Sequence, residues 1–333
     1  MSSFYDIIGQ QNAVDFLEGA IRENRVSHAY IFDGQALSGK RTLAGIFAKT
    51  LLCEEGGVNP CNHCHSCSMA ESGNHPDIIT IRHEKAATLS VGEIREQLVA
   101  DIAIKPYMGR RKIYIVPDAS LMNQQAQNAL LKTLEEPPAY ATIILLTDNE
   151  MKLLPTLRSR SVTLKMKPVS EKLIEEFLRK NTQADERQIK IASAFSGGAP
   201  GRARALIEDE NFEALRNEII RVAEGIHKFS ITEINEAVKK AAEYKDRIND
   251  YLDMFLLFMR DVLMMKAEGE DAKIIFAGEE SLVRQKAENM TYERVNRVMD
   301  EIKTVRNRLS SNVNFDMTME LLFLTMKGNG ENG

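Results

Sequence analysis

The chain has 333 residues, enough for two or three domains of ordinary size. Hydrophobic residues make up 44% and charged residues 27% of the chain, and no apolar run reaches the roughly 18 to 20 residues of a membrane-spanning helix. A formal net charge of −5 disfavours a protein that binds nucleic acid by itself, because neutralising phosphates requires concentrated Lys and Arg. The first residues lack the basic and then apolar layout of a signal peptide, so we expect a cytoplasmic protein without membrane contacts.

Residues 34–40 (GQALSGK) have the spacing of a phosphate-binding P-loop. In such a loop Gly34 and Gly39 allow the backbone N–H groups to face phosphates, and the ammonium group of Lys40 reaches them. Arg41 stands where the motif places the Ser or Thr that ligates Mg²⁺. Because a guanidinium has no acceptor for a metal cation, the sequence predicts a nucleotide-binding scaffold with one chemical part missing.

A cluster that contains every cysteine of the chain follows the helix after the P-loop. Its members are Cys53, Cys61, Cys64 and Cys67. The last three form two overlapping C-x2-C steps, and four thiolates would complete a tetrahedral structural Zn²⁺ site with no position open for catalysis. His63 or His65 could replace one thiolate. Disulfide bonds are the alternative, which a cytosolic location disfavours.

Short apolar runs alternate with helical patterns in the first half of the chain, which predicts a parallel α/β sheet. We expect strands at 29–32, 77–81, 112–116, 142–146 and 161–164. The helix after the P-loop has an apolar stripe within 43–51, and a second helix at 90–102 begins with a capping box at Ser90 and Glu93. A third helix at 123–135 is ended by Pro137.

Only helical patterns follow Pro168, and no proline follows Pro200. We expect a small helical domain at 168–207 and an all-α bundle beyond it. We expect five or six helices in that bundle, within periodic segments near 211–228, 232–268, 280–289, 291–309 and 313–327. Leu321, Leu322 and Phe323 fit either the core of this bundle or an interface. The tail 328–333 is predicted to be disordered.

A P-loop ATPase also needs acidic residues at the end of a later strand, to hold Mg²⁺ and orient the attacking water. The strand that ends at Val116 is followed by Pro117 and Asp118, so only one carboxylate is available there. Asp118 fits a turn residue or the cap of the next helix better than a metal ligand. A second metal-binding part is therefore absent.

With these features the chain resembles the AAA+ clamp-loader family of bacterial replication. The resemblance is carried by residues 8–10 (IGQ), 27–32 (SHAYIF), the P-loop with the cysteines after it, 128–138 (NALLKTLEEPP) and 157–161 (LRSRS). It covers residues 1–206, and in the C-terminal helices only order and length agree. It implies an AAA+ P-loop domain with a parallel sheet and a zinc module at 1–167, a helical lid domain at 168–207 and an oligomerising helical collar at 208–327.

The resemblance also implies roles for single residues. Thr147, at the end of the strand 142–146, corresponds to the sensor-1 residue that faces a γ-phosphate. Arg160 corresponds to the arginine that projects toward nucleotide on a neighbouring subunit, although Ser161 replaces the cysteine of the family motif. Gly201 stands where ATP-hydrolysing members place the sensor-2 arginine.

Three losses, at Arg41, Pro117 and Gly201, predict a subunit without ATP hydrolysis of its own and argue against ATP and Mg²⁺ as its cofactors. The resemblance implies a stator subunit of the clamp loader of the DNA polymerase III holoenzyme. Such a subunit helps gamma/tau ATPase subunits and a delta subunit to load the sliding clamp onto primer–template DNA. In this hypothesis Arg160 acts as an arginine finger in trans.

Two other hypotheses remain open. In an active gamma/tau-type ATPase, Thr42 would replace the missing hydroxyl, although a shift of one residue turns it about 100° round the helix. In a self-contained DNA-binding zinc protein, the cysteine cluster and residues 109–112 (GRRK) would form the contact surface, against the acidic overall charge.

Overall fold

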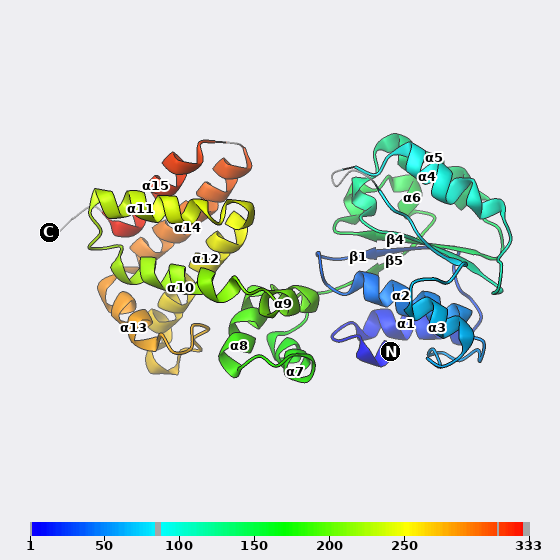
Figure 1. Cartoon of the computed structure of the whole chain (residues 1–333), viewed down its shortest axis with the longest axis horizontal. Helices are drawn as coiled ribbons and strands as arrows, with labels where there is room; N and C mark the ends of the chain where they lie inside the picture. Colours follow the sequence, from blue (N-terminus) through cyan, green and yellow to red (C-terminus); the bar gives the residue numbers. More distant parts are fainter. Residues whose placement is uncertain (1, 84–87, 312, 329–333) are drawn as a thin grey trace. The chain divides into compact units, whose positions relative to one another are not determined.

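The computed structural model describes residues 2–83, 88–311 and 313–328. It divides into two units, which Figure 1 draws together and which are described separately below. The first consists of Met1–Phe177 with Gly198–Arg202, and the second of Leu178–Gly197 with Ala203–Gly333. The finer division into three domains stays a prediction. Of the predicted disordered tail, residues 329–333 lie outside the described residues.

The first unit is built on a five-stranded parallel sheet with the order β2-β3-β4-β1-β5. The strands are β1 (Ala29–Asp33), β2 (Ile78–Thr80), β3 (Lys112–Val116), β4 (Ala141–Thr147) and β5 (Val162–Lys165). All five predicted strands are confirmed, to within one residue at each end. Asp33 pairs with Thr147, and Val116 pairs with Leu145. The carboxyl ends of β1, β3 and β4 therefore meet at one edge of the sheet, where the P-loop begins.

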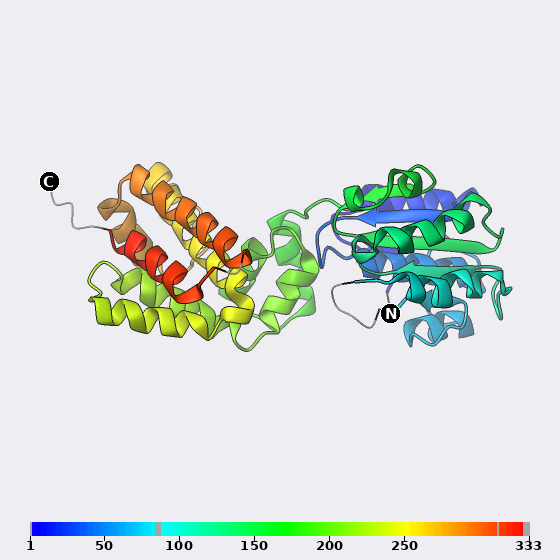
Figure 2. The same ribbon diagram turned by 90° about the horizontal axis from the view of Figure 1, so that it is seen from above.

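Helices cover both faces of this sheet, as Figures 1 and 2 show. They are α1 (Gln11–Arg22), α2 (Lys40–Leu52), α3 (His65–Glu71), α4 (Val91–Ile94), α5 (Gln124–Glu135) and α6 (Pro155–Arg158). Tyr30 and Phe32 pack against α1 and α2, whereas Ala29 and Ile31 pack on the opposite face with α4, α5 and α6. Successive strand residues point to opposite faces, so a sheet covered on both sides requires the mainly apolar strands seen in the sequence.

The predicted helix at 90–102 is only partly α-helical. Ser90 and Glu93 form the predicted capping box at its start. After α4 the backbone widens into a π turn at Arg95–Val99 and then tightens into a 3₁₀ turn at Asp101–Ala103. The apolar residues of this segment recur every four positions, a spacing that drifts round an α-helix by about 40° per step. The wider π turn reduces this drift and keeps them buried.

Asp77, which is buried at the start of β2, holds the loop that leads into β3. Its carboxylate accepts hydrogen bonds from the backbone N–H groups of Tyr107 at 2.6 Å, Met108 at 2.8 Å and Gly109 at 2.8 Å. Burial by itself raises the pKa of Asp77, but these hydrogen bonds lower the pKa below its usual value. The charged carboxylate therefore fixes the loop.

The remaining helices follow β5. They are α7 (Glu171–Asn181), α8 (Glu186–Phe195), α9 (Pro200–Ile207), α10 (Phe212–Gly225), α11 (Ile231–Ala242), α12 (Ile248–Glu268), α13 (Glu280–Asn289), α14 (Tyr292–Ser310) and α15 (Phe315–Lys327). The periodic segment predicted at 232–268 forms two helices, because a 3₁₀ turn at Lys245–Arg247 separates α11 from α12, and α10 to α15 agree with the expected five or six helices. Arg247 forms ion pairs with Asp209 and Asp250, which hold the chain at this turn.

The bundle core surrounds α12. The ring of Phe255 makes edge-to-face contacts with Tyr251 at 5.3 Å and with Phe323 at 6.4 Å between ring centroids. Leu322 and Phe323 are fully buried, whereas Leu321 is 48% exposed. The structure thus assigns the first two to the core and leaves Leu321 on the surface. Among the described helices, none is long and apolar enough to span a membrane.

We expect Asp77→Ala to lower the free energy of unfolding by about 3 kcal/mol, because three N–H groups lose a charged acceptor. Asp77→Asn should lower it less, since one acceptor oxygen remains. The contribution of Asp77 should be complete above its ordinary pKa of 3.8 and be lost as the pH falls through the lower folded-state pKa. Urea unfolding followed by circular dichroism at several pH values measures these effects. Equal stability of the wild-type and alanine proteins at pH 7 would contradict the assignment.

Candidate functional site

The P-loop joins β1 to α2, and its backbone has the conformation that its glycines allow. Gly39 precedes α2 in the left-handed region at φ 96°. A Cβ atom on Gly34 would lie 2.9 Å from the carbonyl oxygen of Met166, so a side chain has no room there. Leu37 is also left-handed, at φ 58°, which costs an L-residue about 1–2 kcal/mol. The loop therefore holds Leu37 in a backbone conformation that is unfavourable for leucine.

Lys40 is bonded within the loop. Its ammonium group donates to the carbonyl oxygen of Gly34 and, at 2.7 Å, to that of Gln35. Burial lowers the pKa of Lys40, and nearby carboxylates oppose this effect. These carboxylates belong to Asp148, Asp33 and Asp118. A polyphosphate at this edge of the sheet would meet three negative charges beside one lysine.

The residues that follow Lys40 offer no buried hydroxyl at the first turn of α2. Arg41 and Thr42 are both exposed. The hydroxyl of Ser38 is buried, and it has no hydrogen-bond partner within the described part of the chain. An oxygen ligand for Mg²⁺ at the position of Arg41 is therefore missing, as the sequence predicts.

Thr147 and Asp118 lie at the carboxyl ends of β4 and β3. The Thr147 hydroxyl is buried, donates to the carbonyl oxygen of Asn149 at 3.1 Å and accepts the N–H of the same residue at 3.1 Å. Asp118 is a turn residue at φ 48° whose side chain makes no capping hydrogen bond. Its carboxylate is 65% exposed and lies 3.8 Å from Nε2 of His83. Of the two roles expected for Asp118, the structure supports the turn and not the cap.

Gly201 lies directly against the P-loop, within the same structural unit. Its N–H donates to the carbonyl oxygen of Leu37 at 3.0 Å. A Cβ atom on Gly201 would lie 2.8 Å from that oxygen, so no side chain fits while this contact exists. Arg204, the nearby arginine on α9, pairs with Glu208 at 2.7 Å. The backbone contact with Leu37 thus leaves no room for a side chain at position 201.

Arg160 lies between α6 and β5. One of its Nη atoms is 3.0 Å from the carboxylate of Glu135, at the end of α5, and the other donates to the carbonyl oxygen of Thr156 at 3.3 Å. The side chains of Arg160 and Glu135 are 37% and 51% exposed. An ion pair this open to solvent contributes less than about 1 kcal/mol, so the guanidinium can exchange Glu135 for another anion at low cost.

The cysteine cluster lies between the end of α2 and the start of α3. The four sulfur atoms lie within 4.8 Å of one another, and all four cysteines are free of disulfide bonds. The Sγ atoms of Cys61 and Cys67 are 3.9 Å apart, close to the separation of about 3.8 Å that Zn–S bonds of 2.3 Å give in a tetrahedron. The donor set therefore fits a tetrahedral metal ion held by four thiolates.

Hydrogen bonds from the backbone prepare this cluster for a thiolate. They come from the N–H groups of His63 and Cys64 and lower the pKa of Cys61 to about 6, whereas burial raises the pKa of Cys67. The ring of His63 contacts Glu55 at 2.6 Å. His63, one of the two histidines that the sequence offered as a substitute ligand, thus has a carboxylate partner, and its ring nitrogen also lies within 4.8 Å of the Cys61 sulfur.

Three contacts of the site were not anticipated from the sequence. They are the bond between Gly201 and Leu37, the carboxylates near Lys40 and the partner of Arg160. Of these three, only the pair between Arg160 and Glu135 had a signal in the sequence, because Glu135 lies in the motif 128–138 that carries the family resemblance.

Comparison with known proteins places the chain among replication proteins. A family model described as DNA polymerase III, delta subunit, matches residues 9–170, and one for the C-terminal part of the delta subunit matches residues 211–327. The DNA polymerase III subunit delta' of Bacillus subtilis is 31% identical over 322 residues, which are 96% of each chain. The subunit tau/gamma of Haemophilus influenzae is 35% identical over 202 residues, 59% of this chain and 29% of that protein.

The solved structure of the Bacillus subtilis DNA clamp loader delta protein aligns with 94% of this chain and 99% of its own. The identity is 13% and the TM-score 0.35, so the family assignment rests on the sequence relatives. Two family models cover most of the chain, and a delta' subunit matches nearly all of it. The chain therefore belongs to the DNA polymerase III clamp-loader subunit family that includes delta', gamma and tau.

Proposed function

We propose that the chain is a non-hydrolysing stator subunit of a bacterial clamp loader. In this role it stands beside gamma/tau ATPase subunits and a delta subunit while they load the sliding clamp onto primed DNA. The match to a delta' subunit over 96% of both chains supports this choice within the family. The helices within 208–327 would serve as its oligomerisation collar, and Met317, Leu321 and Leu324 offer an exposed apolar stripe on α15.

The contact between Gly201 and Leu37 is the observation that carries the proposal. A sensor-2 arginine cannot occupy position 201 while a Cβ atom there would lie 2.8 Å from the Leu37 oxygen. Arg41 and Pro117 remove the two metal-binding parts independently. An active ATPase could tolerate the loss of one of these groups. The loss of all three favours a subunit that does not hydrolyse ATP.

Arg160 would act on the nucleotide of a neighbouring subunit. A guanidinium supplied in trans neutralises charge on the transferred phosphoryl oxygens. The solvent-open pair with Glu135 leaves Arg160 available for this exchange. A subunit whose own site is defective can in this way still contribute to catalysis.

The metal of the cysteine cluster would be Zn²⁺ in a structural role. Four thiolates fill a tetrahedral shell and leave no position for water or substrate. Cys53 follows α2 directly, and the hydroxyl of Ser66 in α3 donates to the carbonyl oxygen of Leu52 at 2.7 Å. The ion would thus hold α3 to the end of α2.

The alternative is an active gamma/tau-type ATPase, supported by the tau/gamma relative that is 35% identical over 202 residues. It would require Thr42 and Asp118 to take over the metal, yet both are exposed. The hypothesis of an autonomous DNA-binding zinc protein loses one of its basic residues. Lys112 of the run 109–112 is buried, and its ammonium group lies 2.7 Å from the Asp101 carboxylate.

For the purified chain we expect no ATP hydrolysis above background and the same result for Lys40→Ala. The reason is that Mg²⁺ lacks both its hydroxyl and its carboxylate ligand. A coupled phosphate-release assay at millimolar ATP and Mg²⁺ measures this. Turnover at a rate ordinary for ATPases, abolished by Lys40→Ala, would instead establish the gamma/tau-type alternative.

In a reconstituted clamp loader, Arg160→Ala should leave assembly unchanged and slow hydrolysis at the one site that receives the arginine by about 10³-fold or more. Single-turnover ATP hydrolysis resolves that site from the others. Glu135→Ala removes the partner of Arg160 within the chain and should not slow hydrolysis. Arg25 lies on the surface of the same unit, so Arg25→Ala is the matched control and should also leave the rate unchanged. A normal rate in the Arg160→Ala complex would exclude the finger.

The purified protein should contain about one zinc ion per chain, as measured by inductively coupled plasma mass spectrometry. Cys64→Ser should lose it, and His63→Ala should keep it, because His63 pairs with Glu55. Removal of the metal with a chelator should lower the melting temperature of the chain, since structural zinc sites contribute folding energy. Full zinc content in Cys64→Ser, or its loss in His63→Ala, would refute the four-thiolate site.

A further inference from the structure

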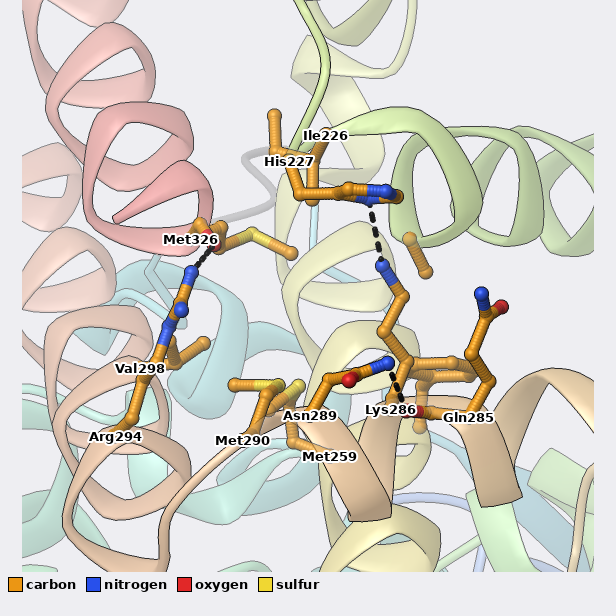
Figure 3. Close-up of a pocket in the computed structure, with 12 residues that line it drawn as sticks. Ile226, His227, Met259, Gln285, Lys286, Asn289, Met290, Arg294, Val298 and Met326 are labelled. Carbon is orange, nitrogen blue, oxygen red and sulfur yellow. Dashed lines mark hydrogen bonds between the residues drawn. The ribbon is translucent and has the colours of Figure 1, made fainter. Parts of the chain in front are cut away.

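The helical bundle encloses a cavity of about 230 Å³ that the proposed function does not use. Its walls come from α10, α12, α13, α14 and α15, so it belongs to the second unit alone. Its floor is buried and apolar, and is formed by Ala223, Ile226, Phe258, Met259, Val298 and Met326. Figure 3 shows Met259, Met290 and Met326 between the side chains of Arg294 and Lys286.

Cationic and neutral polar side chains form the rim of this cavity. They are His227, Gln285, Lys286, Asn289 and Arg294. No Asp or Glu is among the described residues that line it. Sites that bind small molecules combine apolar walls with a few convergent polar groups in this manner.

The positive charge at the rim is only partly compensated. The Lys286 ammonium donates to the carbonyl oxygen of Glu224 at 3.3 Å and to Nδ1 of His227 at 3.2 Å, and both acceptors are uncharged. Burial lowers the pKa of Lys286, the positive charge of Arg294 lowers it further, and the Glu224 carboxylate does not offset them. An anion in the cavity would relieve this repulsion.

Arg294 adds a second cation with spare hydrogen-bonding capacity. One of its Nη atoms donates to the carbonyl oxygens of Met326 at 3.3 Å and Lys327 at 2.7 Å, which close the end of α15. Its Nε atom has no hydrogen-bond partner within residues 2–83, 88–311 and 313–328. Arg294 is therefore fixed in place by the helix end that it caps.

We propose that this cavity binds a small amphiphilic carboxylate, with its apolar body among the methionines and its carboxylate at Lys286. A dry cavity of about 150 Å³ holds benzene, so this volume suits about ten non-hydrogen atoms. The three flexible thioethers adapt to different apolar shapes. The charge of the rim favours an anion over other ligands. Lys286 and Arg294 would repel a cation, and a neutral molecule would not compensate their positive charges.

Octanoate is a suitable probe, and octanamide is its neutral match in size and shape. Isothermal titration of the full chain should give one saturable site for octanoate, with octanamide binding about tenfold more weakly, because one charge-assisted hydrogen bond is lost. Octanoate should also shift the methyl resonances of Met259, Met290 and Met326 in a spectrum of methyl-labelled methionine. Absence of saturable binding, or equal affinity for the two probes, would overturn the proposal.

Two variants locate the site. Lys286→Gln should weaken octanoate binding about tenfold and leave octanamide binding unchanged. Met290→Trp should abolish binding of both probes, because the larger half-buried side chain fills the cavity. Lys239→Gln, the same charge change at an exposed position of α11, should alter neither. Circular dichroism verifies that each variant is folded, and unchanged octanoate affinity in folded Lys286→Gln would refute the site.

Discussion

The contact between the N–H of Gly201 and the carbonyl oxygen of Leu37 is the constraint on which the nucleotide edge of the first unit depends. It brings the start of α9 so close to the P-loop that position 201 has no room for a side chain. It also occupies a carbonyl group of a residue held at φ 58°, a conformation that an isolated leucine would avoid. The hydrogen bond contributes about 1 kcal/mol, which offsets backbone strain of similar size at Leu37. The contact with Gly201 therefore stabilises the left-handed conformation of Leu37.

Lys40 and Arg160, the two cations to which the sequence assigns roles, differ in how firmly they are held. Lys40 is half-buried, bonded to two loop carbonyls and surrounded by carboxylates, so moving it to a phosphate would break existing bonds. Arg160 is held by an ion pair that solvent already weakens. Turning the side chain toward a phosphate therefore costs more free energy for Lys40 than for Arg160. This difference favours a role for the subunit at the nucleotide of a neighbour.

Much of the sheet could be predicted because its strands are buried on both faces, which leaves short apolar runs such as Ile113–Val116 between helical patterns. The cysteine cluster was equally visible, since its spacing alone brings the sulfurs together. The turn between α11 and α12 was not, because Arg247 is held partly by Asp209, which lies far away in the sequence, in the connection between α9 and α10. The cavity of the bundle had no signal either, since five helices contribute to it and no local pattern records their packing.

The P-loop holds its shape without a phosphate to satisfy its backbone N–H groups and its lysine, so contacts within the chain must supply the order of the loop. Here α2 is held at both ends by contacts within the chain. At its start, Lys40 bonds to the loop carbonyls and Gly201 bonds to Leu37. At its end, Cys53 enters the thiolate cluster and Ser66 bonds to Leu52. Because α2 packs on β1, this anchoring fixes the central strands of the sheet, and through β1 it supports β5, the strand that directly follows Arg160. Contacts within the chain thus support the position of Arg160.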